Sequence, residues 1–483
     1  MAVLENLDPN NVFKFFEDMT KIPHGSGNEK AISEYLVDFA KKRNLEVIQD
    51  RELNVIIKKN ASKGYEDILP VIIQGHMDMV CEKNKDSMHD FEKDALKLKI
   101  VDDYIYANGT TLGADNGIAV AYGLALLDSD DIPHPPLELL VTTGEETGMY
   151  GAVALNAKSL NGKILLNIDA EEEGVFFVSC AGGATSTVHF NNDLKETDKP
   201  SLKLEIKGLK GGHSGMEIIK QRGNANKLMG RLLYEIIKEN EINIAHISGG
   251  AKHNAIPREC EAVITVEQKD IEKIKAIANS TIKLIKDELR VQDPDATLEI
   301  SEAGATKQLS SDETKKIIQF LNLTPNGVQT MSQNISGLVE SSLNLGVIEF
   351  SEQKVSFISA VRSSVKSLKS ETLERIEILS HILGAFVTTD SYYPEWQYNP
   401  ESKLRDLCVK TYTELKNCEP KIDAIHAGLE CGLFKEKMPD VDMISFGPNL
   451  YDVHTPEEHI SISSVNSTWE FLKRLLKNMK KLK

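Results

Sequence analysis

The chain has little that would support a disulfide-linked, membrane-spanning or nucleic-acid-binding protein. Its six cysteines are scattered and include no Cys-x-x-Cys pair, so neither a thiolate zinc site nor a disulfide framework is indicated. Basic residues are in the minority, with 56 Lys and Arg against 73 Asp and Glu. The resulting formal charge of −17 argues against a general affinity for nucleic acid or anionic lipid.

Long apolar runs are also missing. No stretch approaches the roughly 18 apolar residues of a membrane span, and the opening MAVLENLDPN lacks the basic flank and apolar core of a signal peptide. We therefore expect a cytoplasmic protein with no membrane partner. The 483 residues, 41% hydrophobic and 27% charged, suit a globular protein of two or three domains.

The first part of the chain alternates apolar runs with segments of helical spacing. Residues 69–74, 137–142 and 163–168 are short apolar runs that fit buried strands, and residues 118–127 between the first two have a helical pattern. Such alternation is typical of a mostly parallel sheet with flanking helices. The predicted fold class is therefore α/β for this part of the chain.

The pattern changes after about residue 183. Alternating strands at 201–206 and 261–266 are accompanied by long amphipathic helices at 224–239 and 270–289, which is typical of an α+β domain. We predict a first domain of residues 1–183 and 393–483, interrupted by an inserted lid domain of residues 184–392. The length of the insert suits two ferredoxin-like halves in tandem, at 201–289 and 296–383, with a hinge at the glycines 182–183 and at residues 392–396.

Two polar motifs of the first domain have the residue types of a metal site. His76 and Asp78, in GHMDM, directly follow a predicted strand, where a neutral imidazole can bind a metal and a carboxylate can orient it. Asp115 lies among glycines in GADNG, before a predicted helix. Alone, the first motif also fits a polar surface loop, and Asp115 also fits a helix cap.

Three further loops carry acidic or histidine side chains after predicted strands. Glu145 and Glu146 lie between glycines in GEETG, Asp169 ends the next strand, and His454 lies in DVHTPE. Adjacent carboxylates are unfavourable unless a cation or proton separates them. Five such loops together favour a shared metal site over unrelated surface loops. Nitrogen and oxygen ligands without a thiolate suit zinc, cobalt or manganese.

The motifs GHMDMV, TLGADNG, TTGEETG, NIDAEE and DVHTPEE occur in an order that resembles the co-catalytic zinc peptidases, which include aminoacylases and glutamate carboxypeptidases. GGHSG, HNAIPREC and HAGLECG add a resemblance to the aminoacyl-histidine (Xaa-His) dipeptidase branch. Together these motifs span essentially the whole chain. The resemblance implies hydrolysis of dipeptides, including carnosine-like substrates, with two divalent metal ions per chain, zinc or alternatively cobalt or manganese.

The resemblance also implies a role for each matching residue. The implied metal ligands are His76 and Asp169 for one ion, Glu146 and His454 for the other, and Asp115 as the bridge between them. Asp78 would orient His76, and Glu145 would be the general base that takes a proton from the attacking water. A cis peptide between Asp115 and Asn116 is also implied.

Three residues of the insert resemble the substrate-contacting residues of the family. His213, in GGHSG, would stabilise the oxyanion, although a surface turn is the alternative reading. Asn254 and Arg362 would hold the substrate, since an arginine fork fits a terminal carboxylate. His426 and Glu430, in HAGLECG, receive no role.

Several alternatives remain open at the level of the sequence. An N-acyl amino acid deacylase or a tripeptidase would use the same metal chemistry, and only the substrate pocket would distinguish them. A non-catalytic peptide-binding protein on the same scaffold is a third reading, against which Glu145 beside a full ligand set argues. Either a monomer or a homodimer is compatible with the sequence.

Overall fold

The structure is a computed structural model that describes residues 2–482, and the chain divides into two compact units. The first unit comprises residues 1–179, 398–424 and 429–483, and the second comprises residues 180–397 and 425–428. The second unit thus begins before the predicted residue 184 and ends after the predicted residue 392. It also takes in four residues near the C-terminal part of the chain that the sequence pattern assigned to the first domain.

The first unit contains an eight-stranded sheet in the order β1-β2-β6-β3-β7-β23-β8-β22. Its strands are β1 (Glu46–Gln49), β2 (Val55–Lys59), β3 (Val71–His76), β6 (Leu137–Thr142), β7 (Ile164–Asn167), β8 (Val175–Cys180), β22 (Lys421–Ile425) and β23 (Asp442–Ser445). The four central strands β6, β3, β7 and β23 are parallel, whereas β2 and β8 join them antiparallel. The predicted α/β class with a mostly parallel centre is confirmed.

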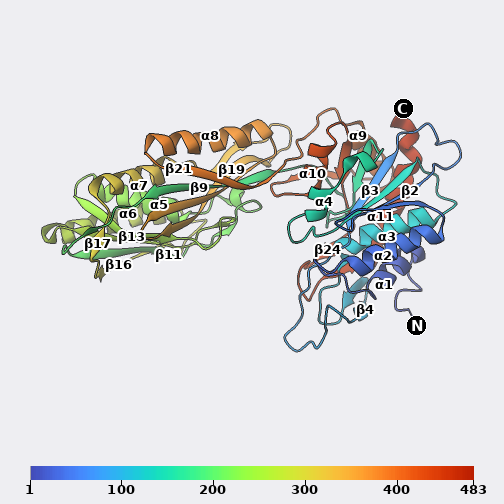
Figure 1. Ribbon diagram of the computed structural model, residues 1–483, viewed down its shortest axis with the longest axis horizontal. Helices are drawn as coiled ribbons and strands as arrows, with labels where there is room; N and C mark the ends of the chain where they lie inside the picture. Colours follow the sequence, from blue (N-terminus) through green and yellow to red (C-terminus); the bar gives the residue numbers. More distant parts are fainter. Residues whose placement is uncertain (1, 483) are drawn as a thin grey trace. The chain divides into compact units, whose positions relative to one another are not determined.

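Helices cover both faces of this sheet. They are α1 (Asn10–Met19), α2 (Lys30–Lys42), α3 (Ala114–Asp128), α4 (Tyr150–Ala154), α9 (Lys403–Lys416), α10 (Glu430–Lys437) and α11 (Ile462–Asn478). Figure 1 shows α1, α2 and α3 layered together on one side of the sheet. On that face a Cβ at Gly75 would lie only 2.6 Å from the Cβ of Ala119, so the glycine lets α3 pack closely against β3.

The parallel strands explain where the polar motifs meet. Because parallel strands end at the same edge of a sheet, the loops after β3, β6, β7 and β23 emerge together. A smaller four-stranded sheet, β24-β25-β5-β4, supports the last of these loops. Its strands are β4 (Leu98–Val101), β5 (Tyr104–Ala107), β24 (Leu450–Tyr451) and β25 (His459–Ser461).

The second unit is built on one antiparallel sheet, in the order β16-β11-β15-β13-β19-β20-β9-β21 with β18 paired to β19. Its strands are β9 (Gly182–Asn191), β11 (Ser201–Lys207), β13 (Ile242–Gly249), β15 (Cys260–Val266), β16 (Thr297–Ala303), β18 (Gly327–Met331), β19 (Val339–Phe350), β20 (Lys354–Ser363) and β21 (Phe386–Tyr393). Two short pairs lie outside it, β10 (Lys195–Glu196) with β17 (Lys307–Gln308), and β12 (Gly212–His213) with β14 (Ala255–Ile256). Helices α5 (Ala225–Ile237), α6 (Ile271–Glu288), α7 (Ser311–Leu323) and α8 (Lys366–Ile382) lie on one face, as Figure 1 shows.

The order of elements along this unit is a nested pair of βαββαβ motifs. The strands β11, β13, β15 and β16, with α5 and α6, form one motif with the order β16-β11-β15-β13. The strands β9, β19, β20 and β21, with α7 and α8, form a second with the order β21-β9-β20-β19. Both are ferredoxin-like arrangements, but the first is inserted after the opening strand of the second. The two halves predicted in tandem, 201–289 and 296–383, therefore differ from the structure in two strands. They leave out β9, and they assign β16 to the second half although it belongs to the first motif.

The segments predicted as hinges lie inside the second unit. A Cβ at Gly183 would lie 2.5 Å from the Tyr393 ring, so this glycine makes room for a side chain. The buried Lys369 ammonium lies 2.5 Å from a Glu395 carboxylate oxygen and donates to the Tyr393 carbonyl at 3.0 Å. These contacts hold the outgoing and returning segments together.

A search of residues 2–482 for helices with the length and hydropathy of a membrane span finds none.

Candidate metal centre

Two histidines converge on one carboxylate at the edge of the parallel strands. His76, the last residue of β3, places Nε2 3.2 Å from Asp115 Oδ1, and His454 places Nε2 3.1 Å from Asp115 Oδ2. Each oxygen of Asp115 therefore faces a different imidazole. Asp115 lies at the start of α3, and the peptide between it and Asn116 is cis, as the resemblance implied.

Each histidine also meets a second carboxylate. His76 Nε2 is 3.6 Å from Asp169 Oδ1, just after β7, and His454 Nε2 is 3.1 Å from Glu146, in the loop after β6. His76, Asp115 and Glu146 each offer one nitrogen or oxygen atom, and these atoms lie within 4.8 Å of one another, close enough to hold a metal ion. The structure thus brings together the five residues proposed from the sequence as ligands, from five separate loops.

The electrostatics of this cluster fit divalent cations. Burial raises the pKa of Asp169 well above its usual value, and neighbouring carboxylates add to the effect. Hydrogen bonds to Asp115 and Glu146 raise the pKa of His454 to about 10. Carboxylates this crowded require positive charge between them, supplied by protons on the histidines or by metal ions. The donor set of imidazole nitrogens and carboxylate oxygens is one that zinc accepts.

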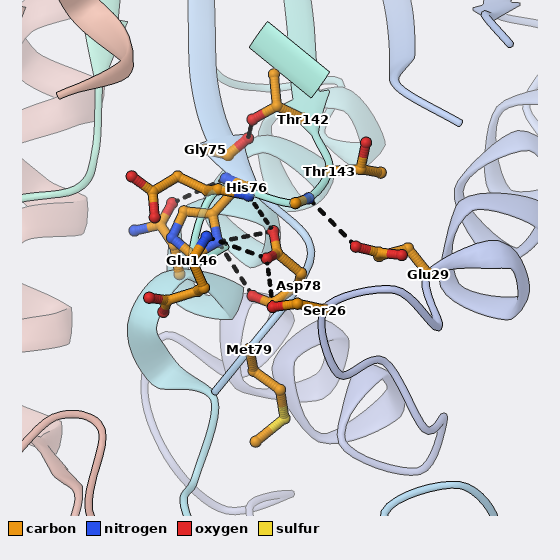
Figure 2. A network of polar contacts seen from close by, with 12 residues as sticks. Ser26, Glu29, Gly75, His76, Asp78, Met79, Thr142, Thr143 and Glu146 are labelled. Carbon is orange, nitrogen blue, oxygen red and sulfur yellow. Dashed lines mark hydrogen bonds and ion pairs between the residues drawn. The ribbon is translucent and has the colours of Figure 1, made fainter. Parts of the chain in front are cut away.

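Asp78 links the first ligand to the loop that bears two glutamates. Its Oδ1 is 3.4 Å from His76 Nδ1 and accepts the Glu145 backbone N–H at 3.1 Å, while its Oδ2 accepts from Ser26 Oγ at 2.8 Å. Figure 2 shows Asp78 between Ser26 and His76. Glu29, also in Figure 2, accepts the Gly144 N–H at 3.2 Å. Ser26 and Glu29 lie in a loop whose sequence, GSGNE, gave no sign of this supporting role.

Glu145 lies beside the ligands in a position that differs from that of Glu146. Burial raises its pKa to about 7, and the carboxylates of Glu146 and Asp115 add to the rise while His76 opposes it. Within residues 2–482 no hydrogen bond to its carboxyl group is found. A carboxyl group with a pKa near neutrality can both take up and release a proton during turnover.

A buried polar layer lies on the face of the sheet opposite α3. Glu430, which opens α10 and is 1% exposed, accepts from Gln74 Nε2 at 2.6 Å and from Thr142 Oγ1 at 2.9 Å. Gln74 in turn accepts from Asn167 Nδ2 at 2.6 Å. Gln74 and Asn167 each precede a candidate ligand by two residues, so Glu430 connects three of the strands that carry the candidate site. The sequence pattern did not reveal this role, because single polar residues within apolar runs have no fixed partner.

The second unit gathers the remaining predicted residues. His213 in β12 pairs with Ala255 in β14, and the Ser214 N–H donates to the Asn254 carbonyl at 2.9 Å, so the GGHSG and HNAIP motifs are neighbours. Burial lowers the pKa of His213, and the Arg362 guanidinium lowers it further. Arg362 donates to the Tyr393 hydroxyl at 2.6 Å.

His426 belongs to the same group of residues. It lies 2.7 Å from Ser342 Oγ, and burial together with Arg362 and His213 lowers its pKa to about 3. It is therefore a neutral imidazole near neutral pH. Its position in residues 425–428, which belong to the second unit, could not be read from the sequence, because the pattern there continues that of the first domain.

The chain is similar to known peptidases over its full length. A model of peptidase family M20/M25/M40 matches residues 72–478, and the chain belongs to this family. The cytosol non-specific dipeptidase of Escherichia coli (strain K12) is 39% identical over 482 residues, which cover 99% of both chains.

Solved structures extend the likeness to the whole fold. The structure of aminoacylhistidine dipeptidase from Vibrio alginolyticus superimposes with a TM-score of 0.95 at 38% identity, covering 98% of this chain and 97% of that one. Aminopeptidase PepT from Bacillus cereus superimposes with a TM-score of 0.56 at 14% identity, covering 98% of this chain and 99% of that one. The second likeness concerns the fold alone.

Proposed function

We propose that the protein is a cytoplasmic dipeptidase that requires two divalent metal ions, zinc in the first instance. The observation that carries the proposal is Asp115, whose two carboxylate oxygens each face a histidine from a different loop. The full-length relatives support the substrate class, since one is a non-specific dipeptidase and another an aminoacylhistidine dipeptidase. Xaa-His dipeptides are accordingly among the proposed substrates.

The proposed ligands divide between two ions. His76 and Asp169 would hold one, Glu146 and His454 the other, and Asp115 would bridge them. Metal ions in such a centre lower the pKa of water and carry the charge that develops on the carbonyl oxygen. His76 Nδ1 lies 3.0 Å from the backbone carbonyl of Asp78 and 3.4 Å from its Oδ1, and these contacts would keep Nε2 directed at the site and fix the tautomer.

Glu145 is the proposed proton carrier. Its carboxylate would take a proton from the attacking water and deliver it to the nitrogen of the departing amine. The backbone N–H groups of Glu145 and Glu146 are both held by Asp78, at 3.1 and 3.3 Å. The orientation of the general base and of a metal ligand therefore depends on the same carboxylate.

Three residues of the insert are proposed to contact the substrate. His213 is proposed to stabilise the developing oxyanion, and Asn254 and Arg362 to hold the peptide. The low pKa of His213 supports this role, since a neutral imidazole can donate one hydrogen bond without adding a fixed charge. One Nη of Arg362 donates to the Tyr393 hydroxyl, and the remaining N–H groups of the guanidinium would bind a substrate carboxylate.

A substrate panel after metal removal tests the proposal. The chelated protein should lose activity and regain it with Zn²⁺, Co²⁺ or Mn²⁺. Dipeptides, including carnosine and other Xaa-His peptides, should then be hydrolysed faster than tripeptides or N-acetyl amino acids. Preference for tripeptides or for N-acetyl amino acids would overturn the substrate assignment, and full activity in the chelated protein would overturn the metal centre.

A further inference from the structure

One buried carboxylate lies behind the loop that carries Asp115. Glu458, 2% exposed, accepts backbone N–H groups from four consecutive residues. Its Oε2 accepts from Leu112 at 2.7 Å and from Gly113 at 3.1 Å, and its Oε1 accepts from Ala114 at 2.8 Å and from Asp115 at 3.3 Å. Each oxygen of this carboxyl group therefore accepts two of the four backbone donors.

Within residues 2–482 these four amides have no other acceptor, and two of them, those of Ala114 and Asp115, open α3. The first N–H groups of a helix lack intrahelical acceptors, and a side chain at the N-cap usually supplies one. Here the N-cap is Gly113, which has no side chain. The acceptor comes instead from a residue more than 340 positions away along the chain.

The position of Glu458 joins two loops of the metal centre. Glu458 follows His454 by four residues, and His454 Nε2 contacts Asp115 Oδ2 at 3.1 Å. The loop 454–458 therefore meets the loop 112–115 twice, once through the imidazole and once through the buried carboxylate. The second contact determines where the backbone of Asp115 lies relative to His454.

We propose that Glu458 is a positioning residue of the metal centre, which holds the backbone of Asp115 so that its carboxylate meets both His76 and His454. This inference rests on the proposed function, because it takes Asp115 as the bridging ligand. Both oxygens of Glu458 accept backbone N–H groups, so the residue would act through the backbone of Asp115 and not as a metal ligand. Loss of the Glu458 carboxyl group should therefore weaken metal binding more than it disturbs the rest of the fold.

The test compares Glu458→Gln with Glu457→Gln, a matched control in which the neighbouring glutamate is exposed. A glutamine side chain has one oxygen, which accepts hydrogen bonds, and one NH₂ group, which only donates them. It can therefore accept from only some of the four backbone N–H groups, and its NH₂ group would face the others donor to donor. Zn²⁺ affinity is measured on the chelated proteins by competition with a chromophoric chelator. Glu458→Gln should bind Zn²⁺ about 10- to 100-fold more weakly, and Glu457→Gln should match the wild type.

Hydrogen exchange of the metal-free proteins provides the second measurement. The amides of residues 112–115 should exchange faster in Glu458→Gln, while those in the middle of α3 keep their protection. If Glu458→Gln lowers the melting temperature yet binds Zn²⁺ like the wild type, the residue only caps α3 and the inference is wrong. If circular dichroism shows that Glu458→Gln is unfolded, the Zn²⁺ affinity of Glu458→Asp is compared with that of the wild type instead. Aspartate keeps the carboxyl group but places it about 1.5 Å further from the four amides.

Asp115→Asn separates this inference from the proposed function. If the wild type binds no Zn²⁺, or if Asp115→Asn binds it as well as the wild type, the proposed centre is wrong and the inference fails with it. If Asp115→Asn loses binding while Glu458→Gln retains it, only the positioning role is refuted. Loss of affinity in both variants, with Glu457→Gln unchanged, supports both.

Discussion

Replacement of Glu145 should separate catalysis from metal binding at two adjacent glutamates. Glu146 lies 3.1 Å from His454 Nε2, whereas Glu145 makes no such contact within residues 2–482. Glu145→Gln should therefore keep its metal and its fold but lose the proton carrier. Loss of a general base costs about 10²–10⁴-fold in rate, or about 3–5 kcal/mol of the barrier at roughly 1.4 kcal/mol per decade.

Burial raises the pKa of Glu145, and the amide of glutamine cannot take up or release a proton in its place. The assay is the rate of dipeptide hydrolysis at saturating substrate, with metal content measured on the same preparation. Glu146→Gln is the contrasting variant and should lose metal as well. A Glu145→Gln enzyme that carries its metal and remains fully active would refute the assignment.

Three further predictions concern His213, Glu430 and Lys369. His213→Ala should lower turnover by about 10²–10³-fold without changing metal content, and an unchanged turnover would exclude an oxyanion contact. Burial is the main cause that raises the pKa of Glu430 to about 8. The folded protein therefore keeps a proton on this residue that the unfolded chain loses. The unfolding free energy of the metal-free protein should consequently fall from about pH 5 to pH 8. Glu430→Gln should reduce that fall by on the order of 1–3 kcal/mol, and urea unfolding that shows the same pH dependence in both proteins would contradict it. Lys369→Met leaves the buried Glu395 carboxylate unpaired and should lower the unfolding free energy, measured by urea denaturation, by about 3–5 kcal/mol. An unfolding free energy within about 0.5 kcal/mol of the wild type would show that the ion pair is dispensable.

The fold class and the family could be predicted because their signals are local. The apolar runs at 69–74, 137–142 and 163–168 predict strands, and they overlap the observed strands β3, β6 and β7. A fully buried parallel strand needs continuous apolar residues, which a local pattern reveals. The polar loops that follow them meet because parallel strands end at a common edge. The arrangement of the insert was harder to predict, because β9 pairs with β21, which lies far away along the chain. The residue pattern of neither strand indicates which strand it pairs with.

The sequence by itself determined which residues have metal-binding chemistry and in which loops they lie. The tertiary structure decided how they are supported. Glu457 and Glu458 have the same chemistry and adjacent positions, yet one is exposed and the other accepts four buried amides from a loop more than 340 residues away. Likewise, Glu430 and His426 lie four residues apart but belong to different units. Burial and long-range hydrogen bonds arise only when distant segments pack together, so no local pattern could assign these roles.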